Sequence, residues 1–184
     1  MNKQDLIKAK LRDLLETESL SDIKVQKLCK ECGINRQTFY YHYTDIEDVL
    51  NDYFLSEKVI GLEQANTWPE LVHAILMYAR GNRQLILKTL KSKASNAVES
   101  FFFNNLFAKG KKFIEQQYGS NLDKNDINEV AKLMSDSLSR EIARLLSNPS
   151  ELSIPAIEEN ISKTFDGVLD LICLNKQNKK GKKV

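Results

Sequence analysis

Apolar residues recur three and four positions apart along almost the whole chain, which is the spacing that places them on one face of an α-helix. In the N-terminal quarter these stretches are short, and they predict helices over residues 3–17, 25–32, 36–43 and from 46 toward 60. Alternating patterns typical of strands are nearly absent, and glycine and proline are scarce, at 7 and 3 residues. We therefore expect an all-α fold.

Beyond residue 66 the amphipathic stretches become longer and predict helices near 68–80, 83–92, 94–118, 124–147 and 154–174, separated by turn residues. The apolar stripes of the last two helices look too extensive for one core. We therefore expect these helices to form a four-helix interface with the same helices of a second chain. The residues predicted for this interface are Leu138, Ile142, Leu145, Phe165, Leu169 and Ile172.

The 184 residues are expected to divide into a three-helix domain over 1–48, a helical domain over 49–175 and a basic flexible tail over 176–184, which holds five lysines. No apolar run approaches the roughly 20 residues that cross a bilayer, and the N-terminus lacks the pattern of a signal peptide. These features predict a cytoplasmic protein that does not contact a membrane. Its three cysteines are then expected to be reduced thiols.

Cys29 and Cys32 form a Cys-x-x-Cys pair, a spacing found in redox motifs and zinc sites. The sequence has no second cysteine pair, and its two histidines are His42 and His73. We therefore interpret the two cysteines as small buried residues of a helix pair, and we expect neither a metal nor a cofactor.

The segment 25–43 contains two short predicted helices joined by a turn with Gly33. A glycine often follows the last residue of a helix, and Asn35 is a favourable N-cap for the next one. Because Phe39 and Tyr43 are four positions apart, they face inward together. The residues left to face outward are Asn35, Arg36, Gln37, Thr38, Tyr40, Tyr41 and His42. This arrangement is that of a helix-turn-helix, whose second helix enters the DNA major groove.

The sequence from Val25 to Tyr43 closely resembles the helix-turn-helix of TetR-family transcriptional regulators, which carry a similar Gly-Val-Ser-x-x-Thr-Phe-Tyr-x-His-Phe signature. The match covers about residues 5–55 and is specific in the Thr-Phe-Tyr-x-His core. The run Arg-Gln-Thr-Phe-Tyr is similar to the firmicute branch of the family that includes the dihydroxyacetone-kinase activator. Beyond this segment the chain is similar to the family in being helical and of suitable length.

The resemblance assigns roles to the outward residues, and their chemistry agrees, since hydroxyls and ring N–H groups donate to phosphates while arginine and glutamine read base edges. Phosphate contacts are implied for Thr38, Tyr40 and His42. Positions closer to base edges are implied for Arg36, Gln37 and Tyr41. Two positions depart from the family pattern. Lys24 replaces the usual capping threonine, so it can contact the DNA backbone but cannot cap, and Ile46 replaces a phosphate-binding lysine.

The resemblance further implies a homodimeric regulator on a palindromic DNA operator, since one recognition helix reads too few base pairs alone. Most family members are repressors released by a small-molecule effector. A small apolar or amphipathic effector is expected in the second domain, and a pocket between helices needs a polar group in an apolar wall. The candidate lining residues are His73, Met77, Tyr78, Phe102 and Tyr118.

The charge balance leaves a second interpretation open. Residues 1–50 hold eight Lys or Arg and nine Asp or Glu, whereas a surface that binds DNA is normally basic. The alternative is a helical adaptor or co-activator that kept the fold and acts through a protein partner, with weak or no DNA binding. An enzyme is not expected, because no phosphate-binding glycine loop, nucleophile elbow or helix-borne His-Glu-x-x-His occurs.

Overall fold

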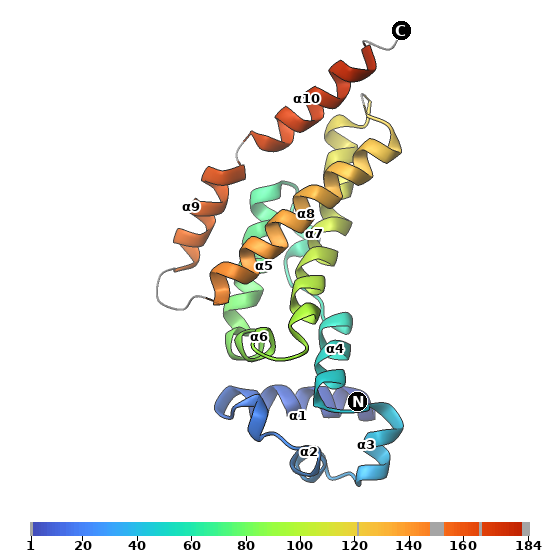
Figure 1. Ribbon diagram of the computed structural model, residues 1–184, viewed down its shortest axis with the longest axis vertical. Coiled ribbons are helices and arrows are strands. Elements are labelled where there is room, and N and C mark those ends of the chain that lie inside the picture. Colours follow the sequence, from blue (N-terminus) through green and yellow to red (C-terminus); the bar gives the residue numbers. More distant parts are fainter. Residues whose placement is uncertain (1, 121, 148–152, 166, 182–184) are drawn as a thin grey trace. The chain divides into compact units, whose positions relative to one another are not determined.

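The structure is a computed structural model that describes residues 2–120, 122–147, 153–165 and 167–181. Side chains are described throughout these ranges except at 164, 165, 177 and 179–181. All regular elements in the described part of the chain are helices (Figure 1), which confirms the predicted all-α class. None of these helices is long and apolar enough to span a membrane.

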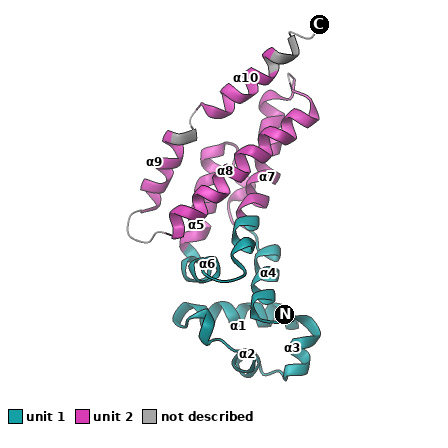
Figure 2. Cartoon of the chain, in the orientation of Figure 1, with its two compact units in different colours: residues 1–58, 81–101 teal, residues 59–80, 102–184 magenta. Residues whose placement is uncertain are grey.

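The chain forms two compact units that differ from the predicted domains (Figure 2). Unit 1 comprises residues 1–58 and 81–101, and unit 2 comprises residues 59–80 and 102–184. The N-terminal unit therefore includes a later segment of the chain, and the division falls inside a long helix. Sequence position could not reveal this, because packing of side chains distant in sequence defines the unit.

Unit 1 is built on α1, which packs against α2, α4 and α6. Its elements are α1 (Lys3–Thr17), the short 3-10 helix η1 (Leu20–Asp22), α2 (Val25–Cys32), α3 (Arg36–His42), α4 (Ile46–Ser56) and α6 (Arg83–Leu90). The fully buried side chains at its centre include Ile7, Leu11, Leu15, Leu28 and Phe39. The apolar stripe predicted for the first helix therefore packs in the core of unit 1.

Local sequence rules explain where α2 and α3 begin and end. Gly33 has a φ of 62°, in the left-handed region that favours glycine, and ends α2. The side chain of Asn35 accepts a hydrogen bond of 2.8 Å from the backbone N–H of Thr38 and caps α3. Lys24 precedes α2 without a side-chain cap, as predicted. The two short helices are therefore set by their caps as well as by their apolar residues.

Unit 2 is a helical bundle in which α8 packs against both α9 and α10. Its elements are the 3-10 helix η2 (Leu62–Gln64), α5 (Trp68–Gly81, whose last residue belongs to unit 1), α7 (Ser95–Tyr118, from residue 102), α8 (Lys124–Ser147), α9 (Ile154–Phe165) and α10 (Val168–Gly181). The prediction of one continuous helix over 154–174 is wrong. Gly167 has a φ of 71°, a left-handed conformation that a helix cannot contain, and α10 starts after it.

The C-terminal residues also differ from expectation. α10 extends to Gly181, so residues 176–181, assigned to a flexible tail, are helical. The ammonium group of Lys176 lies 2.9 Å from a carboxylate oxygen of Asp126 and 2.6 Å from one of Glu129. These contacts raise the pKa of Lys176, chiefly through Glu129 and then Asp126. Residues 182–184 lie outside the described part.

The prediction of the dimer interface requires a correction, because several of its residues are buried within one chain. Leu138, Ile142 and Leu145 are 1%, 0% and 4% exposed within a single chain, in which α9 and α10 also pack on α8. They are therefore not open to a second chain. Leu169 is also buried and Ile172 is half-buried, while the side chain of Phe165 lies outside the described part.

Candidate functional site

The outward surface of α3 collects the polar and aromatic residues that the sequence singled out. Tyr40 and Tyr41 are 57% and 84% exposed, which is unusual for large aromatic side chains. Thr38 and His42 are half-buried. The remaining predicted residues of this surface are exposed: Lys24, Asn35, Arg36 and Gln37. The structure thus places all eight residues where a partner can reach them, and Phe39 faces the core of unit 1.

Hydrogen bonds hold two of these side chains in place. The guanidinium of Arg36 donates a 2.9 Å hydrogen bond to the side-chain oxygen of Gln26, which lies on α2. The hydroxyl of Thr38 donates to Asn35 at 3.0 Å. Gln26 was missed by sequence reasoning, because it is ten positions before Arg36 and only the fold places the two side chains together. An arginine held in this way is prepared for a directional contact.

The end of α3 is held by a partly buried polar network. The hydroxyl of Tyr43 donates to Asp52 on α4 at 2.6 Å, and the ammonium of Lys8 on α1 lies 3.1 Å from the same carboxylate. Burial, followed by the hydrogen bond to Asp52, raises the pKa of Tyr43. Lys8 also donates to Ser56 at 2.8 Å. Three helices of unit 1 are therefore joined behind the α3 surface.

Charge is unevenly distributed within unit 1. Residues 24–43 carry four Lys or Arg and one carboxylate, that of Glu31. The other acidic residues of the first 50 positions lie in or beside α1, η1 and the start of α4. The near-neutral total for residues 1–50 therefore conceals a basic α2–α3 segment. A positive segment of this kind favours contact with a polyanion.

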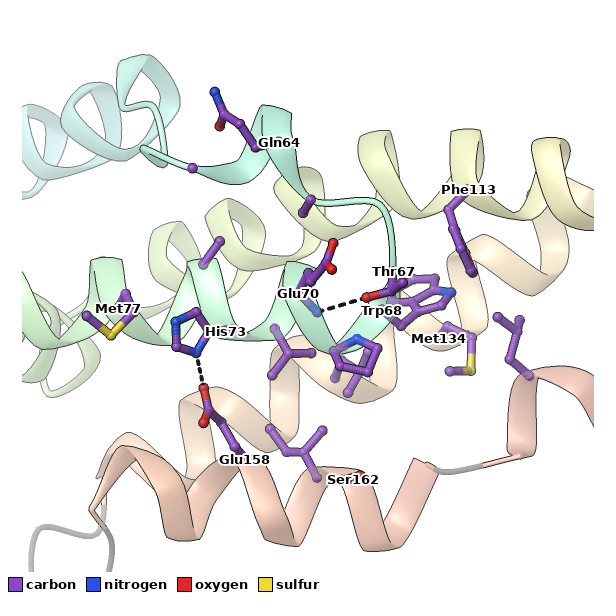
Figure 3. A pocket seen from close by; sticks show the side chains of 18 of the residues that line it. Gln64, Thr67, Trp68, Glu70, His73, Met77, Phe113, Met134, Glu158 and Ser162 are labelled. Carbon is purple, nitrogen blue, oxygen red and sulfur yellow. Dashed lines mark hydrogen bonds and ion pairs between the residues drawn. The ribbon is translucent and has the colours of Figure 1, made fainter.

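Unit 2 contains a pocket of about 990 Å³, at the upper end of the ~300–1,000 Å³ common for small-molecule sites. Trp68, Val72, Phe113, Met134 and Leu138 are among its apolar lining residues. Figure 3 shows Trp68, Phe113 and Met134 together in one part of the pocket, with His73 and Glu158 in another. Because α5, α7, α8, α9 and α10 all contribute side chains, the cavity is a product of tertiary packing.

Three of the five predicted pocket residues line the cavity, and the other two do not. His73, Met77 and Tyr118 line the cavity. Phe102 is fully buried and is not among the lining residues, and neither is the half-buried Tyr78. His73 is exposed at the cavity rather than embedded in an apolar wall.

Two hydrogen bonds connect polar groups across the pocket lining. The Nδ1 of His73 on α5 lies 2.5 Å from a carboxylate oxygen of Glu158 on α9 (Figure 3). The hydroxyl of Tyr118 on α7 donates to Asp170 on α10. Burial, followed by this hydrogen bond, raises the pKa of Tyr118. The carboxylates are what the sequence analysis missed, because Glu158 and Asp170 look like ordinary solvent-facing residues of amphipathic helices.

The described residues contain no group of three or more His, Cys, Asp or Glu side chains that could hold a metal ion. Cys29 and Cys32 are 4% and 8% exposed, which confirms their predicted place as small buried residues. Burial raises the pKa of both thiols and of Cys173.

Comparison with known proteins shows the fold. No protein-family model and no curated protein sequence matches the chain. Among solved structures, the dihydroxyacetone kinase operon activator DhaS is similar, with 17% identity, a TM-score of 0.61 and 96% of each chain covered. The TetR family repressor AlkX from Dietzia sp. strain DQ12-45-1b, implicated in biodegradation of n-alkanes, is similar with 15% identity and a TM-score of 0.65. That match covers 92% of this chain and 96% of AlkX, and both neighbours are regulators by description. The chain therefore has the fold of TetR-type transcriptional regulators.

Proposed function

We propose that this protein is a sequence-specific DNA-binding transcriptional regulator of TetR type, which acts as a homodimer on a palindromic operator. The exposed surface of α3 carries this proposal. Six of the seven positions from Asn35 to Tyr41 present donors or aromatic faces to solvent, and the seventh, Phe39, is buried. A globular protein has no structural need for two exposed tyrosines beside an oriented arginine, whereas a DNA duplex offers acceptors for all of them.

The proposed dimer follows from the size of the recognition helix. α3 spans only residues 36–42, so one copy reads too few base pairs for a specific site. Exposed leucines remain on the helices that were expected to form the interface. Leu133 on α8 and Leu171 and Leu174 on α10 are 52%, 60% and 53% exposed. We propose these three, in place of the buried Leu138, Ile142 and Leu145, as the apolar contacts with a second chain.

The pocket supports regulation by a small molecule. Its lining begins at Ile60 and Gly61, directly after the first segment of unit 1 ends at Lys58. The chain passes between the units again before Gly81 and before Phe102. A ligand that moves α5 or α7 can therefore alter unit 1 through the covalent chain. We propose that ligand and operator affinities are coupled in this way, by ~1–3 kcal/mol, and that the ligand releases the operator.

The experiment is selection of bound sequences from a random duplex pool with the purified full chain at moderate salt. We expect a palindromic site to be enriched. The test variants are Tyr40→Phe, which keeps the ring packed on Phe39, and Tyr41→Ala. The matched control is Leu55→Ala, which removes a 77% exposed apolar side chain from α4 of the same unit.

Enrichment by the parent and the control, with weaker enrichment by both tyrosine variants, supports the regulator. A folded parent that enriches no sequence at low salt contradicts it and favours the adaptor, which binds a protein partner instead. Enrichment that is unchanged in both tyrosine variants would show that the surface of α3 does not recognise the DNA sequence. Circular dichroism of each variant verifies that unit 1 remains folded.

A further inference from the structure

The lining of the unit 2 pocket combines aromatic rings with negative charge. Trp68, Phe113 and Tyr118 contribute three aromatic side chains. Among the described residues that line the cavity, four are carboxylates and none is lysine or arginine. The carboxylates are Glu70 on α5, Glu158 and Glu159 on α9, and Asp170 on α10. Even if His73 is counted as a full positive charge, the lining remains negative.

Two of the four carboxylates accept hydrogen bonds from neutral groups, and the other two lie beside a histidine and an exposed lysine. Glu158 contacts His73, and Asp170 accepts a hydrogen bond from the neutral hydroxyl of Tyr118. Glu70 accepts a hydrogen bond of 2.7 Å from the backbone N–H of Asn66. Glu159 pairs with Lys163 at 2.6 Å, but both side chains are mostly exposed, so the pair is weak.

We propose that the pocket binds an organic cation with a large apolar body. This inference rests on the ligand-binding role proposed above and narrows it to one chemical class. The apolar walls exclude small hydrated ions, whereas aromatic faces attract a delocalised or quaternary cation. The carboxylates on three helices stabilise the positive charge and reject an anion of the same shape. A volume of about 990 Å³ accommodates a ligand with several rings.

A matched pair of probes tests the charge preference. Tetraphenylphosphonium and tetraphenylborate have nearly the same size and shape and carry opposite charges. Trp68 is the single tryptophan of the chain and lines the pocket, so its fluorescence reports occupancy without any DNA present. We expect the phosphonium ion to bind about tenfold or more tightly than the borate ion at low salt.

The test variant is Glu158→Gln combined with Asp170→Asn, which removes two charges and retains the size of both side chains. The control is Glu115→Gln, an exposed residue of α7 outside the lining, which changes the total charge without changing the pocket. We expect the preference for the cation to fall severalfold in the double variant and to persist in the control. Circular dichroism confirms that each variant is folded.

Equal or tighter binding of the borate, binding of neither ion, or a preference unchanged in the double variant would overturn the inference. Different outcomes test the proposed function. If the phosphonium ion binds with the expected preference but leaves operator affinity unchanged, the ligand class stands and the coupling is refuted. If an operator is selected but the cation preference is missing, the DNA-binding role stands and the ligand class is refuted.

Discussion

The hydroxyl of Tyr43 donates a 2.6 Å hydrogen bond to the carboxylate of Asp52 and so connects the residue that ends α3 with the middle of α4. Lys8 of α1 contacts the same carboxylate. Burial raises the pKa of Asp52, but the hydrogen bond from Tyr43 and the contacts with Lys8 lower it by more, so the pKa lies below the ordinary value of 3.8. The folded state therefore favours the ionised carboxylate.

Because the pKa of Asp52 is lowered in the folded state, the stability of unit 1 should depend on pH. The stabilisation by Asp52 is present above the ordinary carboxyl pKa and is lost as the pH falls below about 4, through the lowered pKa of the folded state. Tyr43→Phe removes the hydroxyl and should destabilise unit 1 by about 1–2 kcal/mol at neutral pH. Urea unfolding at several pH values measures both effects. An unchanged acid dependence in Tyr43→Phe would contradict the assigned role.

Gln26 is expected to position Arg36 rather than contact DNA itself. Gln26→Ala leaves the arginine free to move, so operator affinity should fall by about 1 kcal/mol and discrimination at one base pair should relax. Arg36→Ala should cost about 1–3 kcal/mol at the same base pair. Titration against operator duplexes altered at single positions measures these losses. Losses at different base pairs for the two variants would show that Gln26 acts independently.

The exposed leucines of α8 and α10 give a dimer prediction. Leu171→Glu places a charge at a 60% exposed position and should yield a folded monomer with intact helicity. Leu138→Asp should instead unfold unit 2, because its side chain is 1% exposed within one chain and a buried unpaired charge is strongly destabilising. Light scattering gives the mass and circular dichroism the helicity. A folded Leu171→Glu dimer would show that the interface lies elsewhere.

Gly110 allows Trp68 to lie against α7. A Cβ at this position would overlap Cη2 of the indole and lie 2.6 Å from Cζ2. Because the indole is rigid and only 8% exposed, Gly110→Ala should destabilise unit 2 by about 1–3 kcal/mol and change the tryptophan emission. The matched control is Gly81→Ala, where nothing lies within 4 Å of the new Cβ. Thermal unfolding should show no destabilisation for the control, and an equal effect in both variants would refute the contact.

The sequence by itself determined the features that depend on neighbouring residues. The helix-turn-helix was predictable because Gly33 and Asn35 act on backbone groups within one turn of themselves. The inward position of Phe39 and the exposure of Tyr40 and Tyr41 follow from helix periodicity. The start of α5 at Trp68 was predictable because Thr67 precedes it and Pro69 stands in the first turn, where a missing N–H is not needed. These rules act over three or four residues, so no knowledge of the fold was required.

The tertiary structure decided which apolar faces and charges meet. The stripe of α8 predicted an interface, but Leu138 is 1% exposed within a single chain, where it lines the pocket of unit 2. Helix periodicity shows which face of a helix is apolar, but it does not show which other element packs against that face. The pocket likewise depends on Glu158 and Asp170, which are separated in sequence from His73 and Tyr118 by 85 and 52 positions. Contacts across such separations are set by how whole helices pack, and no local pattern records them.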